Sequence, residues 1–388
     1  MGSELITNII SNTGWFCFLI AGIGSVYTLL AGMLVRRFFR HEAVETQEFP
    51  PVSILKPLHG DEFGLRENLE ALCNLDYPTQ FQLVFGVQDP TDPAIRHVED
   101  LRRDYPHIDI SLVVDIREHG ANRKVSNLIN LMREVRHEYL VVADSDIGTD
   151  RDYLRRIVTE MVRPQVGLVT CLYRGKPSMG LWPRLSAMAI EYHFVPSVIF
   201  GLGVGLARPC FGSTIALRRS ILQQIGGFEA FADHLADDNA IGEAVRELGY
   251  KVAIPPMAVT HTCTERTLRE LIVHEIRWAR TIRAVGGPGF AGTIITHPLP
   301  FALLGGIALG LSFPTVAVIL TVLACRLTLR HQVDHVLGGR SVGWWLVPVR
   351  DMLSFIVFCA TFFVGSVTWR GRRFVIGTNG ILSPVEER

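Results

Sequence analysis

A short apolar run at residues 139–143 ends in Asp144-Ser145-Asp146, and this junction limits the possible folds more than any other feature of the chain. A buried parallel strand reads as a short continuous apolar run, and open α/β sheets bind ligands at the carboxyl ends of such strands. Two carboxylates at such an end suit Mg²⁺ or Mn²⁺, which prefer oxygen ligands and share their coordination with substrate phosphates. A surface turn also favours Asp and Ser. The pair alone is therefore a weak signal that needs support from other segments.

Short apolar runs alternate with helical patterns from residue 50 onwards, which is typical of βαβ units and a mainly parallel sheet. Strands are expected at residues 52–56, 81–87, 108–114 and 139–143. Asp89 and Asp144 then both follow strand ends, where a shared crevice is expected. The chain contains no G-x-x-x-x-G-K-[ST] sequence, and its glycines at residues 201–205 lack the G-x-G-x-x-G spacing. These observations argue against a P-loop NTPase and a dinucleotide-binding fold.

Three apolar stretches indicate a membrane protein. The hydrophobic fraction of 48% and the mean hydropathy of +0.26 are high for a soluble chain. Residues 15–35 carry no charge and are long enough for one crossing, and further apolar stretches lie at residues 298–325 and 344–369. The basic cluster at residues 36–40 places the following segment in the cytosol by the positive-inside rule. We therefore expect about three transmembrane helices around a cytosolic domain.

The expected organisation has four parts. These are an N-terminal transmembrane helix at 13–36, an α/β domain with interfacial helices at 50–290, a C-terminal membrane region at 291–370 and a cytosolic tail at 371–388. Residues 185–207 are also nearly apolar, but a crossing there would separate Asp144 from Asp238. We expect an interfacial helix at this position, with a plain core helix as the alternative. Arg350-Asp351, inside the third apolar stretch, indicates a shallow or re-entrant element.

Charge and cysteine content exclude several classes of protein. Lys+Arg and Asp+Glu are equal at 38 each, so no basic field indicates a nucleic-acid partner. The seven cysteines are scattered without a C-x-x-C pair, which indicates a reducing compartment and argues against a disulfide or zinc framework. His261-Thr262-Cys263 has the composition of half a metal site, but no second pair lies nearby in the sequence. Packing within a strand is the favoured interpretation of this segment.

Further candidate residues lie downstream. Asp237-Asp238 precedes a helical pattern that ends at Gly249. A carboxylate at a helix start can cap it, but capping needs only one acid. His274 and Arg277-Trp278 lie on a helix before the second apolar stretch, where an interfacial Arg/Trp belt is the alternative.

Taken in order, these segments resemble glycosyltransferase family 2 and its relatives. The closer resemblance is to the ceramide glucosyltransferase family, including bacterial hopanoid-associated glycosyltransferases. The motifs that carry it span about residues 50–280: Ser53-Ile54-Leu55-Lys56-Pro57, Asn74-Leu75-Asp76-Tyr77-Pro78, Val87-Gln88-Asp89-Pro90, Asn122-Arg123-Lys124 with Asn127-Leu128, Asp144-Ser145-Asp146, Gly226-Gly227-Phe228, Ala236-Asp237-Asp238 and Arg277-Trp278. The resemblance implies a Rossmann-like α/β fold of the GT-A type with a mainly parallel sheet. It also implies transfer of a sugar from a nucleotide donor with inversion.

The same resemblance implies roles for individual residues. Asp238 would be the general base, and Asp144 and Asp146 would hold Mg²⁺ or Mn²⁺. The residues expected to bind the donor are Pro57, Asp89, Lys124, Asp144, Arg277 and Trp278. Asp237, His193 and His274 are candidates for the acceptor site. The family has Gln or Arg where this chain has His274, so the contact made there differs.

The function implied is a membrane-integral enzyme at the inner (cytoplasmic) membrane. It would move one hexose, N-acetylglucosamine or glucose, from a UDP-sugar to a lipid hydroxyl on the cytosolic side. The bacterial character of the terminal segments favours a hopanoid polyol such as bacteriohopanetetrol as acceptor, with ceramide as the alternative. A polysaccharide synthase would need several more membrane helices, and a transporter or scaffold would leave the large soluble domain and its acids unexplained.

Overall fold

The computed structural model describes residues 2–41, 46–339, 343–363, 367–369, 372–376 and 382–384. The chain forms two compact units. The helical unit comprises Met1–Arg40, Pro177–Arg208 and Glu265–Gly365, and the sheet unit comprises His41–Lys176, Pro209–Thr264 and Ser366–Arg388. The predicted domain at 50–290 therefore contributes residues to both units. Each unit is described by itself.

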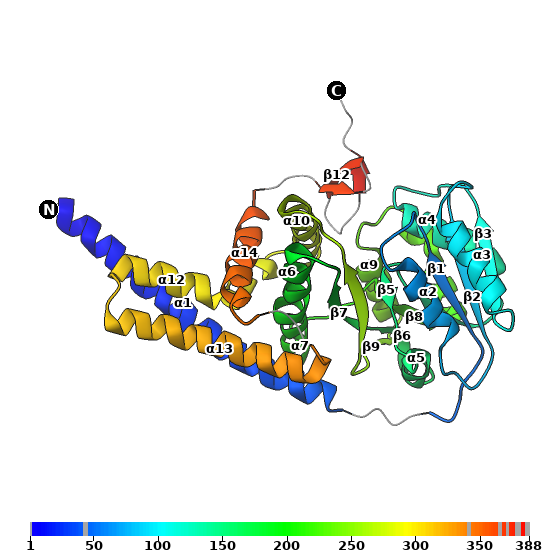
Figure 1. The fold of residues 1–388 in the computed structure, drawn as a ribbon, viewed down its shortest axis with the longest axis horizontal. Helices are drawn as coiled ribbons and strands as arrows, with labels where there is room; N and C mark the ends of the chain where they lie inside the picture. The colour runs from blue at the N-terminus through cyan, green and yellow to red at the C-terminus, as the bar shows by residue number, and fades with distance from the viewer. Residues whose placement is uncertain are drawn as a thin grey trace. The chain divides into compact units, whose positions relative to one another are not determined.

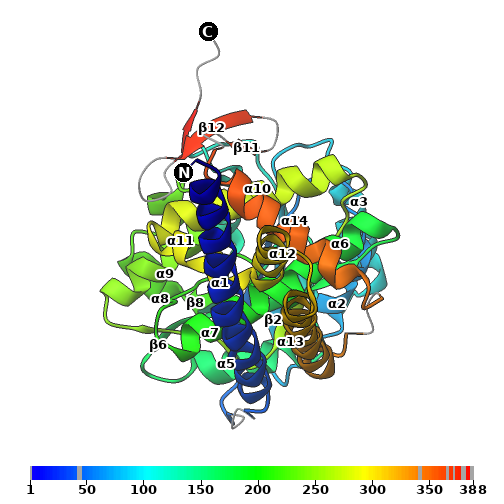
Figure 2. The same cartoon turned by 90° about the vertical axis from the view of Figure 1, so that its left-hand side faces the viewer.

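In the helical unit, α1 (Gly2–Phe39), α12 (Pro298–Leu309) and α13 (Phe313–Leu337) run side by side (Figures 1 and 2). Cys17 and Ala21 of α1 pack with Ala302 and Val322 in their shared core. The remaining elements are α6 (Leu181–Ala189), η2 (Ile190–Phe194), α7 (Val195–Gly203), α10 (Leu268–Gly286), α11 (Gly289–Gly292), η4 (Thr293–Thr296) and α14 (Leu346–Ala360). One turn of π-helix, η2, lies between α6 and α7, and such turns are frequent at functional sites.

Three helices among the described residues are long and apolar enough to cross a membrane: Glu4–Phe39, Leu181–Gly203 and Phe313–Leu337. A fourth candidate is the pair Gly289–Thr296 and Pro298–Leu309, which is bent by 70°. About three such helices were predicted, and this number is confirmed, but the segments differ. The stretch at 298–325 is divided, because Gly310 has a φ of +82° and Ser312 begins α13 with a capping box.

An interfacial or core helix was expected at residues 185–207. The helical segment Leu181–Gly203 covers most of these residues and has the length and composition of a membrane span, and its placement at the membrane interface stays a prediction. The stretch at 344–369 contains α14, whose 15 residues are fewer than a crossing needs. Residues 364–366 of that stretch, and residues 371, 377–381 and 385–388 of the predicted tail, lie outside the described residues. The described part of the tail contributes β12 (Arg372–Ile376) and β13 (Leu382–Pro384), which join β11 (Val367–Trp369) in an antiparallel sheet.

The described part of the sheet unit contains a seven-stranded sheet in the order β3-β2-β1-β4-β8-β6-β9. Its strands are β1 (Val52–Pro57), β2 (Phe81–Val87), β3 (Asp109–Val114), β4 (Tyr139–Val142), β6 (Val166–Thr170), β8 (Ile215–Arg218) and β9 (Lys251–Ala253). In the described part of this sheet, β8 runs antiparallel to both of its neighbours, and the other neighbouring strands pair in parallel. The predicted α/β class with a mainly parallel sheet is therefore confirmed. A smaller sheet contains β5 (Ile147–Gly148), β10 (Ala258–Cys263) and β7 (Leu172–Pro177).

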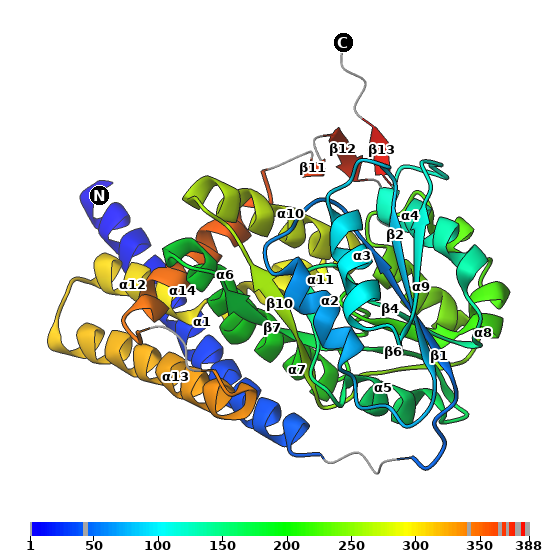
Figure 3. The same cartoon turned by 45° about the vertical axis from the view of Figure 1, so that its right-hand side comes forward.

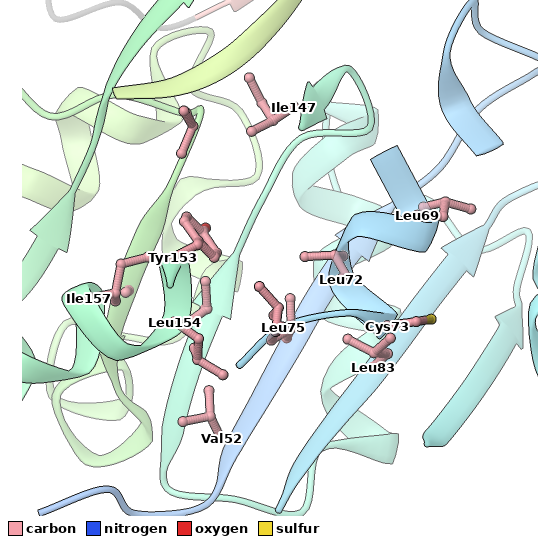
Figure 4. Packing of buried hydrophobic residues seen from close by; sticks show 14 of the residues in the cluster. Val52, Leu69, Leu72, Cys73, Leu75, Leu83, Ile147, Tyr153, Leu154 and Ile157 are labelled. Atoms are coloured by element: carbon pink, nitrogen blue, oxygen red, sulfur yellow. The ribbon is translucent and has the colours of Figure 1, made fainter. Parts of the chain in front are cut away.

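Helices cover both faces of the large sheet, as its continuous apolar strands require (Figure 3). On one face, Val52 and Leu83 pack with Leu72 and Tyr153, as Figure 4 shows. The helices of this face are α2 (Leu65–Cys73), α3 (Ala94–Asp104) and α5 (Tyr153–Met161). The opposite face packs against α4 (Arg123–Leu131), α8 (Arg219–Gln224), η3 (Phe228–Phe231) and α9 (Asp237–Glu247). Two cores therefore fix the carboxyl edge of the parallel strands, where the predicted site lies.

Candidate functional site

The Asp144-Ser145-Asp146 turn lies between the two sheets of the sheet unit. The pairing of β4 with β1 ends at Val142, and Ala143 adds one backbone hydrogen bond to Leu55. The backbone carbonyl of Asp144 then accepts the N–H of Ile147 at 3.2 Å, which closes the turn before β5. The two acids therefore lie just beyond the last ladder pair of a central strand, as the sequence predicted.

The side chain of Lys124, at the start of α4, contacts this turn. Asn122 caps that helix by accepting the N–H of Val125 at 3.1 Å. The cap fixes the first turn of α4, so that Lys124 Nζ lies 2.7 Å from Asp144 Oδ1 and 3.7 Å from Asp237 Oδ2. Lys124 therefore connects the two groups of acids that the sequence singled out.

Asp237 and Asp238 lie in the first turn of α9 and have different surroundings. The N-cap of α9 is Ala236, so neither acid caps the helix from that position. Asp237 is buried and accepts a hydrogen bond from Asn122 Nδ2 at 3.2 Å. Asp238 is partly exposed and accepts the backbone N–H groups of Gly212 at 2.8 Å and Asn239 at 2.7 Å.

Gly212 marks the point on which these groups converge. A Cβ atom on Gly212 would lie 3.2 Å from Lys124 Nζ and 3.5 Å from both Asp144 Oδ2 and Asp238 Oδ2. The missing side chain therefore lets an amine and two carboxylates approach the backbone of Gly212 closely. Sequence reasoning missed Gly212; the only signal was a glycine two residues after a buried cysteine and three before β8.

Burial and neighbouring charges shift the pKa values of these groups. Burial, reinforced by the charge of Asp237, raises the pKa of Asp238 to about 6. Burial also raises the pKa of Asp144, although Lys124 opposes this. For Lys124, burial favours the neutral amine, but the carboxylates of Asp144 and Asp237 outweigh it and raise the pKa. A carboxylate with a pKa near 6 is suited to accept a proton near neutral pH.

His261 of β10 lies next to the second acid of the turn. Its Nδ1 is 3.3 Å from Asp146 Oδ2, and its ring is 5.8 Å from the ring of Tyr173. Burial raises the pKa of Asp146, but His261 and the nearby lysines lower it to about 2. The sequence favoured strand packing for His261, and the structure adds this contact with Asp146, which only the fold could bring about.

These residues fit a divalent cation. Among the described residues, no three His, Cys, Asp or Glu side chains are arranged as a metal-ligand group. Mg²⁺ and Mn²⁺ with a nucleotide need only one or two protein carboxylates, because phosphates and water complete the coordination. Asp237 Oδ2 is buried without a hydrogen-bond partner, which adds to the negative charge around the turn. Asp144 and Asp146 are the residues that could hold the cation, with phosphate oxygens and water as the other ligands.

Pro57 and Asp89 lie on the same edge of the sheet. Pro57 ends β1 and pairs in register with Gly86 of β2. Asp89 follows β2, is exposed, and accepts the N–H and the hydroxyl of Thr91, each at 2.7 Å. These hydrogen bonds lower the pKa of Asp89. Since β1, β2 and β4 are parallel, Pro57 and Asp89 share the carboxyl edge with Asp144, as predicted.

The remaining predicted residues belong to the helical unit. His193 lies in η2, where its Nε2 is 3.0 Å from Asp351 Oδ1. His274, Arg277 and Trp278 lie on α10. The Nδ1 of His274 is 2.5 Å from Glu265 Oε1, and its ring meets the Trp278 ring edge-on at 4.4 Å. Glu265 also accepts the hydroxyl of Ser186, so the His274 ring has a fixed orientation next to Trp278.

Comparison with known proteins identifies the relatives of this chain. Ceramide glucosyltransferase 3 of Caenorhabditis elegans is 26% identical over 250 residues, which cover 62% of this chain and 52% of that protein. Ceramide glucosyltransferase 1 of the same organism is 24% identical over 276 residues, which cover 70% of this chain and 58% of that protein. The chain thus spans little more than half the length of these relatives.

Among solved structures, the mannosyltransferase PcManGT from Pyrobaculum calidifontis, in complex with GDP-Man and Mn²⁺, superposes with a TM-score of 0.53 and 19% identity. The match covers 90% of this chain and 99% of that chain, and it confirms the predicted GT-A type of fold. The profile of glycosyl transferase family 21 matches residues 16–382. Because this match extends over nearly the whole sequence, the chain belongs to glycosyl transferase family 21.

Proposed function

We propose that this protein is a membrane-integral, inverting glycosyltransferase that moves one hexose from a UDP-sugar to the hydroxyl group of a membrane lipid. The observation that carries the proposal is the convergence of Lys124, Asp144 and Asp238 on Gly212. An amine and a metal-binding acid suit a diphosphate, and a carboxylate with a raised pKa suits removal of a proton. Together they supply what sugar transfer from a nucleotide donor can use: stabilisation of the leaving diphosphate and a proton acceptor.

Asp238 would act as the general base. The acceptor hydroxyl oxygen forms a bond to the anomeric carbon while the bond from that carbon to the diphosphate breaks, which inverts the configuration. Asp238 takes the hydroxyl proton, and UDP carries away the bonding electrons. The hydrogen bonds from Gly212 and Asn239 orient the Asp238 carboxylate for this step. Asp237 is the weaker candidate for the base, because it is buried and bound to Asn122.

The diphosphate would bind next to four side chains, those of Lys124, Asp144, Asp146 and His261. A bound Mg²⁺ or Mn²⁺ would neutralise the charge that develops on the leaving diphosphate. Asp144 and Asp146 would hold this cation, His261 would orient Asp146, and Lys124 would add a fixed positive charge beside it. Asp89 and Pro57 would contact the nucleoside, since they lie on the same sheet edge.

The acceptor would be a membrane lipid that presents only its head group, because each methylene removed from the bilayer costs about 0.8 kcal/mol. The apolar helices of the helical unit would hold the enzyme at the inner (cytoplasmic) membrane, with the sheet unit in the cytosol. We propose a hopanoid polyol such as bacteriohopanetetrol as acceptor and N-acetylglucosamine or glucose as the donor sugar. The names of the two nematode relatives make ceramide the alternative acceptor.

Arg277 and Trp278 would bind the pyrophosphate and a sugar face, a role that suits the planar guanidinium of arginine. Asp237, His193 and His274 are the candidates for contacts with the acceptor. His274 stands where the family has Gln or Arg, and Glu265 orients it here, so it is the candidate most specific to this chain.

The test is a release assay for UDP with the full-length protein in lipid nanodiscs. UDP-N-acetylglucosamine and UDP-glucose are each combined with bacteriohopanetetrol or with ceramide, and the lipid product is analysed by mass spectrometry. Asp238→Asn is the inactive control. Sugar transfer to either lipid supports a lipid glycosyltransferase, and the preferred lipid identifies the acceptor. Formation of a polymer, or no release of UDP with any combination, would contradict the proposal.

A further inference from the structure

The Asp144-Ser145-Asp146 turn is held by a segment that precedes it by some eighty residues. Lys56 is fully buried on β1 and donates from Nζ to the carbonyl of Ile147 at 2.9 Å. Glu62 accepts the hydroxyl of Ser145 at 2.5 Å, and Asn68 Nδ2 donates to the carbonyl of Ser145 at 3.2 Å. Three side chains from the segment 56–68 therefore contact Ser145 and Ile147, the residues on either side of Asp146.

Few backbone hydrogen bonds hold this turn. The ladder between β1 and β4 ends at Val142, two residues before Asp144, and β5 has only two residues. The N–H of Ile147 bonds to the carbonyl of Asp144 and the N–H of Thr262 to the carbonyl of Asp146, each at 3.2 Å. Carboxylates also repel one another, and Asp144, Asp146 and Glu62 all act on Lys56 electrostatically. Without further support, we expect these like charges to move the turn apart.

We propose that Lys56, Glu62 and Asn68 form a turn clamp that holds Asp144 and Asp146 ready to receive the divalent cation. Lys56 supplies a positive charge among the acids and a hydrogen bond at the end of the turn. Glu62 and Asn68 hold its centre through Ser145. Gly148 completes the arrangement, since a Cβ there would lie only 2.8 Å from Asn68 Oδ1. These are positioning residues, because each contacts the turn and none is required to touch the donor.

The inference rests on the proposed function in one respect, the cation, and the test separates the two. Lys56→Met and Glu62→Ala each remove one contact of the turn clamp. Ser53→Ala is the control for Lys56, because Ser53 is buried on the same strand but bonds to Gln82 at 2.8 Å. Glu67→Ala is the control for Glu62, because Glu67 is an exposed glutamate of the neighbouring helix α2.

The first measurement is hydrogen–deuterium exchange at residues 144–148 of the full-length, metal-free protein. The turn clamp predicts exchange about tenfold faster in Lys56→Met and Glu62→Ala, the effect of losing one charged hydrogen bond. Exchange in Ser53→Ala and Glu67→Ala should match the wild type. Unchanged exchange in Glu62→Ala, whose substitution is at a partly exposed site and is compatible with folding, overturns the clamp.

The second measurement is binding of Mn²⁺ in the presence of UDP, followed by electron paramagnetic resonance. We expect the dissociation constant for Mn²⁺ to rise about tenfold in the two clamp variants and to stay constant in the controls. If exchange accelerates but the wild type binds no Mn²⁺, the turn clamp stands and the metal role in the proposed function fails. If the wild type binds Mn²⁺ and the clamp variants bind it equally well, the inference is wrong and the proposed function is unaffected.

Discussion

The amine of Lys124 lies 2.7 Å from Asp144 Oδ1, which ties the first turn of α4 to the end of β4. Because the neighbouring carboxylates raise the pKa of this amine, Lys124 stays charged at physiological pH. A diphosphate that binds Lys124 brings negative charge that competes with Asp144 for this amine. We therefore expect donor binding to loosen the Lys124–Asp144 pair and to free Asp144 for a cation.

Replacing Asp238 with Asn should abolish transfer while the UDP-sugar still binds. An amide keeps the shape of the carboxylate but cannot take the acceptor proton, and general base catalysis contributes roughly 10²- to 10⁴-fold to the rate. Turnover is measured as UDP release and donor affinity by calorimetry. Near-normal turnover would remove Asp238 from this role and direct attention to Asp237.

The rate should depend on pH with a midpoint near 6 on the acid side. The pKa of Asp238 is raised to about 6, so this carboxyl is protonated and inactive as a base below that pH and active above it. kcat/KM should therefore rise as pH increases through 6 and then level off. Asp237→Asn should move the midpoint to lower pH, because the charge of Asp237 contributes to the raised pKa. An unchanged midpoint in that variant would argue that another group controls the acid limb.

Removal of the metal should weaken donor binding for the same reason as removal of its ligands. Asp144→Ala and Asp146→Ala should each weaken metal-dependent binding of the UDP-sugar, and EDTA should inhibit the wild type. Titration of donor affinity against Mn²⁺ concentration measures both effects. Full activity after exhaustive chelation would leave Lys124 and Arg277 as the sources of positive charge.

Gly212→Ala should lower kcat/KM about tenfold or more with little change in melting temperature. The added methyl group would lie 3.2 Å from Lys124 Nζ and would crowd Asp144 and Asp238. The φ angle of Gly212 is one that other residues adopt, so alanine adds no backbone strain there. Gly292→Ala is the control, since a Cβ there meets nothing within 4 Å. Equal activity of the two variants would show that the space at Gly212 is not used by the substrates.

The sequence predicted the sheet and its edge because local patterns determine them. The apolar runs at 52–56, 81–87, 108–114 and 139–143 are β1 to β4, within one residue at each end. The acids at the strand ends were found because a parallel sheet brings such ends together. The parallel order of β1, β2 and β4 then placed Asp89 and Asp144 on one edge.

Contacts between distant segments left no local pattern. In the sequence, Lys56 is an ordinary lysine next to a proline. Its hydrogen bond to the carbonyl of Ile147 joins residues that are 91 positions apart, so no local pattern predicts it. His261 approaches Asp146 because β10 pairs with β5, a strand of only two residues that periodicity cannot reveal. Membrane helices were misplaced for a similar reason, since hydropathy averaged over residues 298–325 conceals the break at Gly310.

The ion pair between Arg350 and Glu275 should be essential to the stability of the helical unit. Arg350 is 1% exposed and donates to both Glu275 oxygens, at 2.6 and 2.7 Å, and to the carbonyl of Leu185. The pair joins α14 to α10, the helix that carries Arg277 and Trp278.

Removing one partner leaves a buried charge without compensation, so Arg350→Met should lower the free energy of unfolding by about 3–5 kcal/mol. Arg350→Met with Glu275→Leu should recover much of this loss, because no charge is then left buried. Arg103→Met, at the exposed pair with Asp100, is the control and should have little effect. Thermal unfolding of the full-length protein in detergent compares the three variants, and equal losses in the single and double variants would contradict this account.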